Sequence, residues 1–196
     1  VMDFTAIDFE TATGAWDSAC SVAVVAVQND KLVRSYYTRI RPPFNKYNPF
    51  NISIHGIHEE DTENERDFAG IWESLAKELE GRIVLAHNAP FDMGVLRACI
   101  HRYDLKWPKF SYADTVKIAR RVWPELENHK LNTIADHLNV RFKHHDALED
   151  AKMCAAILIR AAEKLAEGKP ADLFAKAEEI STKAFLRKLG IAVVPF

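Results

Sequence analysis

Four acidic residues stand at three separated places where a predicted strand ends or a predicted helix begins. Asp8 and Glu10 lie two residues apart at the end of an apolar β-like segment, so their side chains project from one face of the strand. Asp92 follows an apolar run at 83–86, and Asp150 lies at the start of a long helical period. Because an unpaired carboxylate in apolar surroundings costs several kcal/mol, the pair on one strand favours a cation-binding site with hard oxygen ligands.

A histidine accompanies the last acid. Asp146, followed three residues later by Glu149, predicts a capping-box-like helix start with Asp146 as N-cap and Asp150 in the first turn. His145 stands just ahead of this cap, from where its side chain can converge with Asp150. We expect its neighbour His144 to be solvated.

Each acid also has a purely structural interpretation. Asp8 and Glu10 could be solvated acids at an exposed strand end. Asp92 could interact only with the exposed N–H groups and dipole of a helix N-terminus. Convergence of all four acids therefore depends on the elements that carry them.

The elements predict an α/β fold. Three segments rich in β-branched and aromatic residues, at 4–10, 20–28 and 31–40, indicate an antiparallel meander, and 41–66 looks like a long surface connection. A helical period from 68 to 79, a buried parallel strand at 83–86 and a fifth strand at 110–115 follow. Further helices are expected near 131–138 and 148–165. The sheet is thus mixed and five-stranded, with three antiparallel and then two parallel strands and with helices on both faces.

Composition limits the alternatives. The chain has 196 residues, 48% apolar content and a net charge of −2, which suits one domain with an appendage and excludes holding a polyanion by global charge. The scattered glycines exclude Gly-rich phosphate loops, and the longest apolar run, near 22–27, is far too short to span a membrane. Three isolated cysteines predict buried thiols in a reducing cytoplasm.

Positive charge is concentrated in one region. Residues 97–143 contain ten Lys or Arg and five Asp or Glu, and this surplus could follow the backbone of a single nucleic-acid strand. The alternative is that these residues form ordinary solvated helix faces.

Taken together, the motifs resemble the DEDDh (DnaQ-like) 3′-to-5′ exonucleases of the ribonuclease-H-like fold, including the epsilon proofreading chains of bacterial DNA polymerase III. The resemblance covers about residues 3–166 and rests on three ordered motifs: Asp8-x-Glu10-Thr11, His87-Asn88-Ala89-x-Phe91-Asp92 and His145-x-Ala147-x-x-Asp150. The sequence departs from its relatives at Phe9 and at Ala12-Thr13-Gly14, which affects contacts with the terminal nucleotide.

The resemblance implies a metal-dependent nuclease with two divalent cations, Mg²⁺ or Mn²⁺. Asp8 would bridge both ions, Glu10 and Asp150 would complete the site of the attacking water, and Asp92 would support the second ion. His145 would be the general base, since an imidazole with a pKa near 6.5 accepts a proton near neutral pH.

The resemblance also implies a substrate and a pocket for its terminal nucleotide. We expect release of nucleoside 5′-monophosphates from single-stranded or frayed DNA 3′ ends, in proofreading or DNA repair. Four residues match positions that line the terminal-nucleotide pocket in similar proteins: Thr11, His55, Asn88 and Phe91. Phe91 also has the simpler interpretation of a core residue.

Three alternatives stay open. The first is an RNA-trimming exonuclease similar to oligoribonuclease or RNase T. The second is an HD-type phosphohydrolase, suggested by His145-Asp146, although that family is all-helical. The third is a non-catalytic nucleic-acid-binding module, which would not need all four acids and the histidine.

The chain divides into two parts. Residues 1–166 are expected to form the exonuclease domain, and 167–196 a helical C-terminal tail. The tail could tether a polymerase catalytic subunit or another partner, or it could pack back on the domain.

Overall fold

A mixed sheet of six strands runs through the centre of the protein in a computed structural model that describes residues 2–167 and 181–196. The order across the sheet is β3-β2-β1-β4-β5-β6. The strands β1, β2 and β3 are antiparallel, β1, β4 and β5 run parallel, and β6 is antiparallel to β5. The strands are β1 (Phe4–Thr11), β2 (Ala19–Gln28), β3 (Lys31–Arg39), β4 (Ile83–Ala86), β5 (Ser111–Asp114) and β6 (Val194–Pro195).

The predicted α/β class and the mixed sheet are confirmed, and the all-helical HD-type alternative is wrong. The strand count differs by one, because β6 adds to the edge of β5. This strand has only two residues, too few to show an alternating pattern. The Phe196 backbone N–H donates to the Phe110 carbonyl at 3.0 Å, and their rings stack with centroids 4.4 Å apart.

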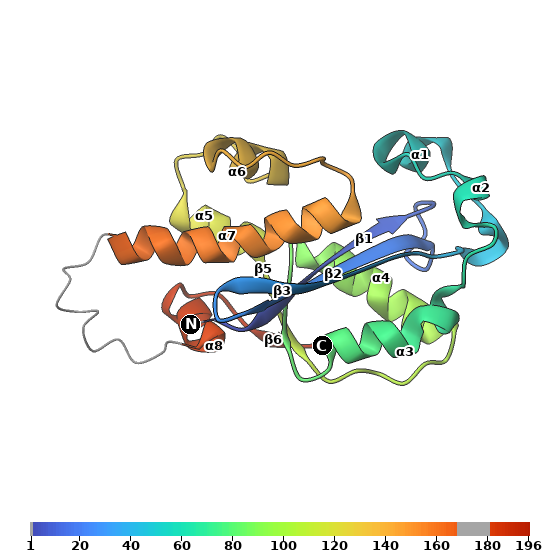
Figure 1. The fold of residues 1–196 in the computed structure, drawn as a ribbon, viewed down its shortest axis with the longest axis horizontal. Coiled ribbons are helices and arrows are strands. Elements are labelled where there is room, and N and C mark those ends of the chain that lie inside the picture. The colour runs from blue at the N-terminus through green and yellow to red at the C-terminus, as the bar shows by residue number, and fades with distance from the viewer. Residues whose placement is uncertain (1, 168–180) are drawn as a thin grey trace.

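Helices pack on both faces of the sheet (Figure 1). On one face, α3 and α4 cover a core that includes Ile7 and Phe9 of β1. On the other, α5, α6 and α7 cover a core that includes Phe4 and Ala6. The helices are α1 (Pro49–His55), α2 (Glu59–Thr62), α3 (Phe68–Leu79), α4 (Ala89–Arg102), α5 (Thr115–Val122), α6 (Leu131–His137), α7 (Ala147–Glu167) and α8 (Thr182–Lys188).

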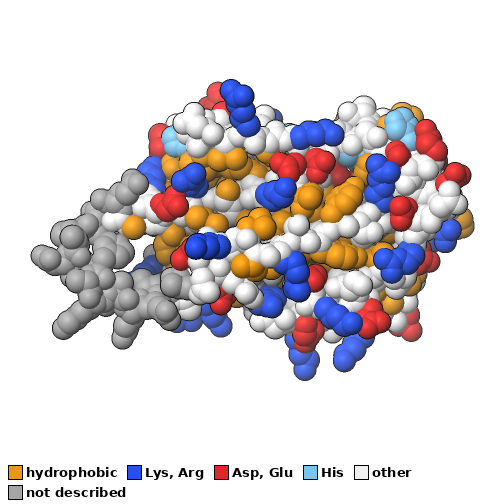
Figure 2. All heavy atoms as spheres, in the orientation of Figure 1, with side chains coloured by type: hydrophobic (Ala, Val, Ile, Leu, Met, Phe, Trp, Pro, Cys, Tyr) orange, Lys and Arg blue, Asp and Glu red, His pale blue; other side chains and the backbone are white. Residues whose placement is uncertain are grey.

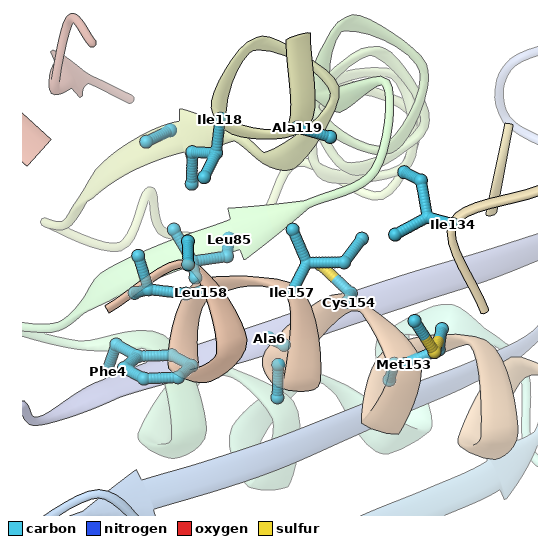
Figure 3. Packing of buried hydrophobic residues seen from close by; sticks show 14 of the residues in the cluster. Phe4, Ala6, Leu85, Ile118, Ala119, Ile134, Met153, Cys154, Ile157 and Leu158 are labelled. Atoms are coloured by element: carbon cyan, nitrogen blue, oxygen red, sulfur yellow. The ribbon is translucent and has the colours of Figure 1, made fainter. Parts of the chain in front are cut away.

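The long helix α7 is central to the second core. Figure 3 shows side chains of α7, among them Cys154, Ile157 and Leu158, packed together with residues of β1, β4, α5 and α6. Because even-numbered residues of β1 face α7, Asp8 and Glu10 project on the same side as Phe4 and Ala6. This alternation places the two acids toward the N-terminal end of α7.

The predicted surface connection at 41–66 contains more regular structure than expected. It holds the 3₁₀ turn η1 (Pro43–Asn45) and the short helices α1 and α2. The Asn48 side chain caps α1 by accepting from the Phe50 N–H, and Gly56 ends the helix at φ 71°. Helices of four and seven residues are too short to show a sustained period.

The described part of the C-terminal tail packs against the domain. The Asp3 N–H donates to the Thr182 hydroxyl at 3.0 Å, and that hydroxyl donates to the Asp3 carbonyl at 2.9 Å. Leu186 of α8 is fully buried in the core beneath α7, and the Arg121 guanidinium donates to the Leu189 carbonyl at 3.0 Å. Residues 168–180 of the expected helical tail lie outside the described residues.

Two compositional expectations can be compared with the fold. All three cysteines are buried and unpaired, as the sequence predicted. None of the described helices combines the length and the apolar character that crossing a membrane requires. Figure 2 shows hydrophobic side chains in a band over the middle of one face. On the edge strand β3, Leu32, Val33 and Tyr37 are exposed.

Candidate active site

The end of β1 and the start of α7 bring three carboxylates together. Asp8 and Glu10 share the α7 face of β1, and Asp150 lies in the first turn of α7. One carboxylate oxygen from each of the three lies within 4.8 Å of the other two. The convergence expected from three distant sequence motifs is therefore present for Asp8, Glu10 and Asp150.

The start of α7 is fixed by the predicted cap. The Asp146 carboxylate accepts from the Leu148 and Glu149 N–H groups at 3.1 and 3.3 Å, and the Asp150 N–H donates to the Asp146 carbonyl at 2.8 Å. The residue just before the cap, His145, has a left-handed backbone with φ 63°. This conformation costs energy in a residue other than glycine, and such strain is concentrated at functional sites.

Two histidines lie close to Asp150, and the predicted convergence of His145 with this acid is present, because a ring nitrogen of His145 lies within 4.8 Å of an Asp150 carboxylate oxygen. The His144 ring, through Nδ1, lies 3.0 Å from Asp150 Oδ1, whereas His145 donates its backbone N–H to Asp150 Oδ2 at 3.1 Å. His144 is exposed, as the sequence predicts, and it also makes a contact that the sequence did not indicate. It bonds the acid directly while its side chain remains 35% exposed.

The His145 ring stays available to the site. It stacks on the His144 ring with centroids 3.8 Å apart, and among the described residues none forms a hydrogen bond with it. Partial burial and the neighbouring His144 lower the pKa of His145. A neutral imidazole near neutral pH is the form that accepts a proton.

The fourth acid, Asp92, lies deeper than the other three. It is only 1% exposed, and its Oδ1 accepts from the Phe9 N–H at 3.0 Å. Burial raises its pKa to about 8 despite the bonds from Phe9 and from its own backbone. Asp92 also affects Asp8. Burial is the first cause that raises the pKa of Asp8 well above its usual value, and the charge of Asp92 is the second.

The acid cluster suits a cation. Burial, then the charges of Asp150 and Asp92, raise the pKa of Glu10 from 4.5 to about 8. Within the described ranges, no residue donates a hydrogen bond to the Asp8 or Glu10 carboxylate. Carboxylate oxygens that repel one another and lack donors form a hard ligand set that fits Mg²⁺ or Mn²⁺.

A cleft of about 580 Å³ opens above these acids. Its two cationic side chains, Arg120 and Lys130, come from the basic stretch at 97–143. The lining is completed by residues from β1, from the turn before α4 and its start, from α5, and from the loops before α6 and α7 and the first turns of those helices: Asp8, Phe9, Glu10, His87, Asn88, Phe91, Val116, Asn128, His129, Leu131, His144, His145 and Asp150.

The four predicted nucleotide-binding residues fall into two pairs. Asn88 and Phe91 line the cleft at the start of α4. Thr11 and His55 bond each other at the end of β1, with His55 Nε2 lying 3.1 Å from the Thr11 carbonyl oxygen, and neither is among the residues that line the cleft.

The sequence did not indicate some of the residues that line the cleft. His87 Nε2 donates to the His129 carbonyl at 2.9 Å, and its Nδ1 bonds the Thr115 hydroxyl at 2.9 Å. These bonds hold the loop before α6 against the ends of β4 and β5. The basic surplus was a signal for Arg120 and Lys130, but nothing in the local pattern marked Asn128 or His129.

The geometry agrees with the comparison with known families. A sequence model described as Exonuclease matches residues 5–158, which include every acid of the cluster and His145. The chain belongs to the exonuclease family. The 3′-5′ exonuclease DinG of Bacillus subtilis is 30% identical over 167 residues, which cover 83% of this chain and 18% of that protein. The PolC-type DNA polymerase III of Caldanaerobacter subterraneus is 32% identical over 171 residues, covering 84% and 12% respectively.

The exonuclease fold is also found in solved structures. Exonuclease X in complex with 5′ overhanging duplex DNA has a TM-score of 0.67 and 25% identity, with coverage of 88% of this chain and 96% of that one. The nuclease domain of 3′hExo, a DEDDh family member bound to rAMP, superposes with a TM-score of 0.71 at 20% identity, with coverage of 85% and 92%. The chain spans less than a fifth of the length of the two curated relatives above.

Proposed function

We propose that this chain is a metal-dependent 3′-to-5′ exonuclease that releases nucleoside 5′-monophosphates from single-stranded or frayed DNA 3′ ends, in proofreading or DNA repair. The observation that carries the proposal is the convergence of Asp8, Glu10 and Asp150 beside His145 at the floor of an open cleft. No simple structural purpose explains three carboxylates gathered in this way, because their mutual repulsion works against folding.

The acids are assigned to two divalent cations. Asp8, Glu10 and Asp150 would hold them, and the buried Asp92 would support the second ion. When bound, such cations activate a water and stabilise the oxygen that leaves phosphorus. Cations held there would take the place of the protons that the raised pKa values keep on these acids, and they would balance the charge of the ionised cluster.

The protein side chains supply the proton transfer and the positioning. His145 lines the cleft, and its ring forms no hydrogen bond with any described residue. Its lowered pKa suits a general base. His144 holds Asp150 through Nδ1 and stacks on His145, so it would orient both groups. Asn88 and Phe91 would contact the terminal nucleotide, and Thr11 and His55 would shape the end of β1 next to it.

DNA is the proposed substrate because the PolC-type relatives are DNA polymerases and the Exonuclease X structure contains duplex DNA. RNA is the second candidate, favoured by the rAMP bound to 3′hExo. A DNA polymerase catalytic subunit is the proposed partner, since the PolC-type relatives carry the matching region within much longer chains.

The domain and location are proposals of the same kind. Residues 1–166 would form the catalytic domain, supported by the family match over 5–158. Residues 167–196 would form the appended tail, with the tether to a partner still a prediction. A cytoplasmic location is supported by the three unpaired, buried cysteines.

Substitution of Asp8 tests the proposal. Asp8→Ala should abolish the release of mononucleotides, and EDTA should abolish it in the wild type. Glu73→Ala is the matched control, because Glu73 is a solvated acid on α3, with its side chain 86% exposed. Full activity of Asp8→Ala with an unchanged circular dichroism spectrum would contradict the assignment. If the wild type and Asp8→Ala are both inactive in Mg²⁺ and in Mn²⁺, the result would support the non-catalytic binding module.

A further inference from the structure

A row of exposed aromatic and cationic side chains leads away from the cleft along α4. It begins at Phe91, which lines the cleft and lies with its ring centroid 5.8 Å from that of Trp16. The Trp16 side chain is 51% exposed. A Cβ at Gly94 would collide with the indole ring, so glycine at this position allows Trp16 to lie directly against the backbone of α4.

The row continues through Arg102 in the last turn of α4. Its guanidinium donates to Asp17 Oδ2 at 2.7 Å, and its Cζ lies 5.9 Å from the centroid of the Phe44 ring. A second hollow, of about 370 Å³, lies between Trp16 and this arginine, and Ala98 and His101 of α4 also line it.

Phe44 is exposed and has an unfavourable backbone conformation. Its side chain is 92% exposed, and its backbone has φ 58°, a left-handed conformation that is unfavourable for a bulky residue. An isolated exposed aromatic residue needs no explanation, but a strained one beside an arginine does.

We propose that Trp16, Arg102 and Phe44 form a second nucleic-acid-binding surface, on which bases 5′ of the terminal nucleotide stack as the substrate strand leaves the cleft. This inference rests on the proposed exonuclease function and extends its substrate contacts. Aromatic platforms bind any base through its π-face, and Arg102, whose charge is paired with Asp17, adds cation–π contact. Continuity with the cleft through Phe91 favours the substrate strand over a protein partner as the occupant.

Binding of single strands of two lengths tests the surface. The probes are a dinucleotide and an octanucleotide of thymidine, each with a 5′ fluorescein label, titrated with protein in EDTA so that hydrolysis is stopped. We expect Trp16→Ala and Phe44→Ala each to weaken binding of the octanucleotide by about tenfold, with a smaller effect on the dinucleotide. Trp107→Ala is the matched control, because Trp107 is 49% exposed and contacts Phe196 at the other end of the sheet.

Two variants separate stacking from a general structural effect. Trp16→Phe should retain most of the octanucleotide affinity but lose most of the tryptophan fluorescence quenching that the strand causes. Gly94→Ala keeps the tryptophan but displaces it, so it should weaken octanucleotide binding without lowering the melting temperature.

Unchanged octanucleotide affinity in Trp16→Ala and Phe44→Ala would overturn the inference and favour a protein partner for this row. An equal loss for both lengths would also overturn it. Failure of the proposed exonuclease function has a different signature, namely a wild-type protein that binds both strands but hydrolyses neither in Mg²⁺ or Mn²⁺.

Discussion

Replacing Glu10 with glutamine should stabilise the metal-free protein at alkaline pH. The pKa of Glu10 is raised from 4.5 to about 8 in the folded protein, first by burial and then by Asp150 and Asp92. The folded state therefore holds this proton more tightly than the unfolded chain does. The stability that the proton contributes is fully present below about pH 4.5 and is lost as the pH rises through about 8.

The magnitude follows from the same shift. A pKa raised from 4.5 to about 8 corresponds to about 5 kcal/mol for a fully buried group. Glu10 is partly exposed to the open cleft, so solvent screening reduces this figure to about 2 kcal/mol. Glutamine has nearly the same shape and does not ionise. Glu10→Gln should thus exceed the wild type by about 2 kcal/mol in free energy of unfolding at about pH 9, and differ little at about pH 4.

Urea denaturation in EDTA across this pH range measures the difference. Glu73→Gln is the control, because Glu73 is a solvated acid paired with Lys77, which lowers its pKa. Adding Mg²⁺ should reverse the order, since the wild type then gains binding energy that the variant lacks. If the free energies of unfolding of Glu10→Gln and of the wild type in EDTA change with pH in the same way, the reasoning is refuted.

Three further predictions concern the base, the cap and the core. His145→Ala should lose most turnover near neutral pH while retaining Mn²⁺ binding by calorimetry; unchanged turnover would remove it from the role of base. Asp146→Ala should lower the free energy of unfolding by about 1 kcal/mol, because two N–H groups of α7 lose their acceptor; an unchanged value in urea denaturation would argue against the cap. Ile157→Ala should lower the free energy of unfolding by about 3 kcal/mol, since this side chain is fully buried in the core that α7 covers; a loss below about 1 kcal/mol would show that the core collapses around the cavity.

The acids and the cap could be predicted because their signals are local. Alternation in β1 assigns Asp8 and Glu10 to one face, and the spacing of Asp146 and Glu149 marks the start of α7. Whether these acids lie close to Asp150 depends on which face of the sheet α7 covers. The ordered motifs of the family predicted that they do.

The remaining features depend on contacts between distant segments. Sequence spacing alone could not tell which of His144 and His145 bonds Asp150, because the choice depends on the left-handed backbone at position 145. The position of Trp16 could not be predicted from its neighbours in the sequence. Its ring lies against α4 only because residue 94, 78 positions further along the chain, is a glycine. The strand β6 is defined only by its pairing with β5.

Digestion of end-labelled single strands tests the central claim most directly. DNA and RNA of equal sequence, labelled at either the 3′ or the 5′ end, are incubated with protein in Mg²⁺ or Mn²⁺ and with an EDTA control. We predict that the 3′ label is released at once as a mononucleotide from DNA, while 5′-labelled DNA shortens one nucleotide at a time. Release of the 5′ label first, internal cuts, or equal digestion in EDTA would contradict a metal-dependent 3′-to-5′ exonuclease built on Asp8, Glu10, Asp92 and Asp150.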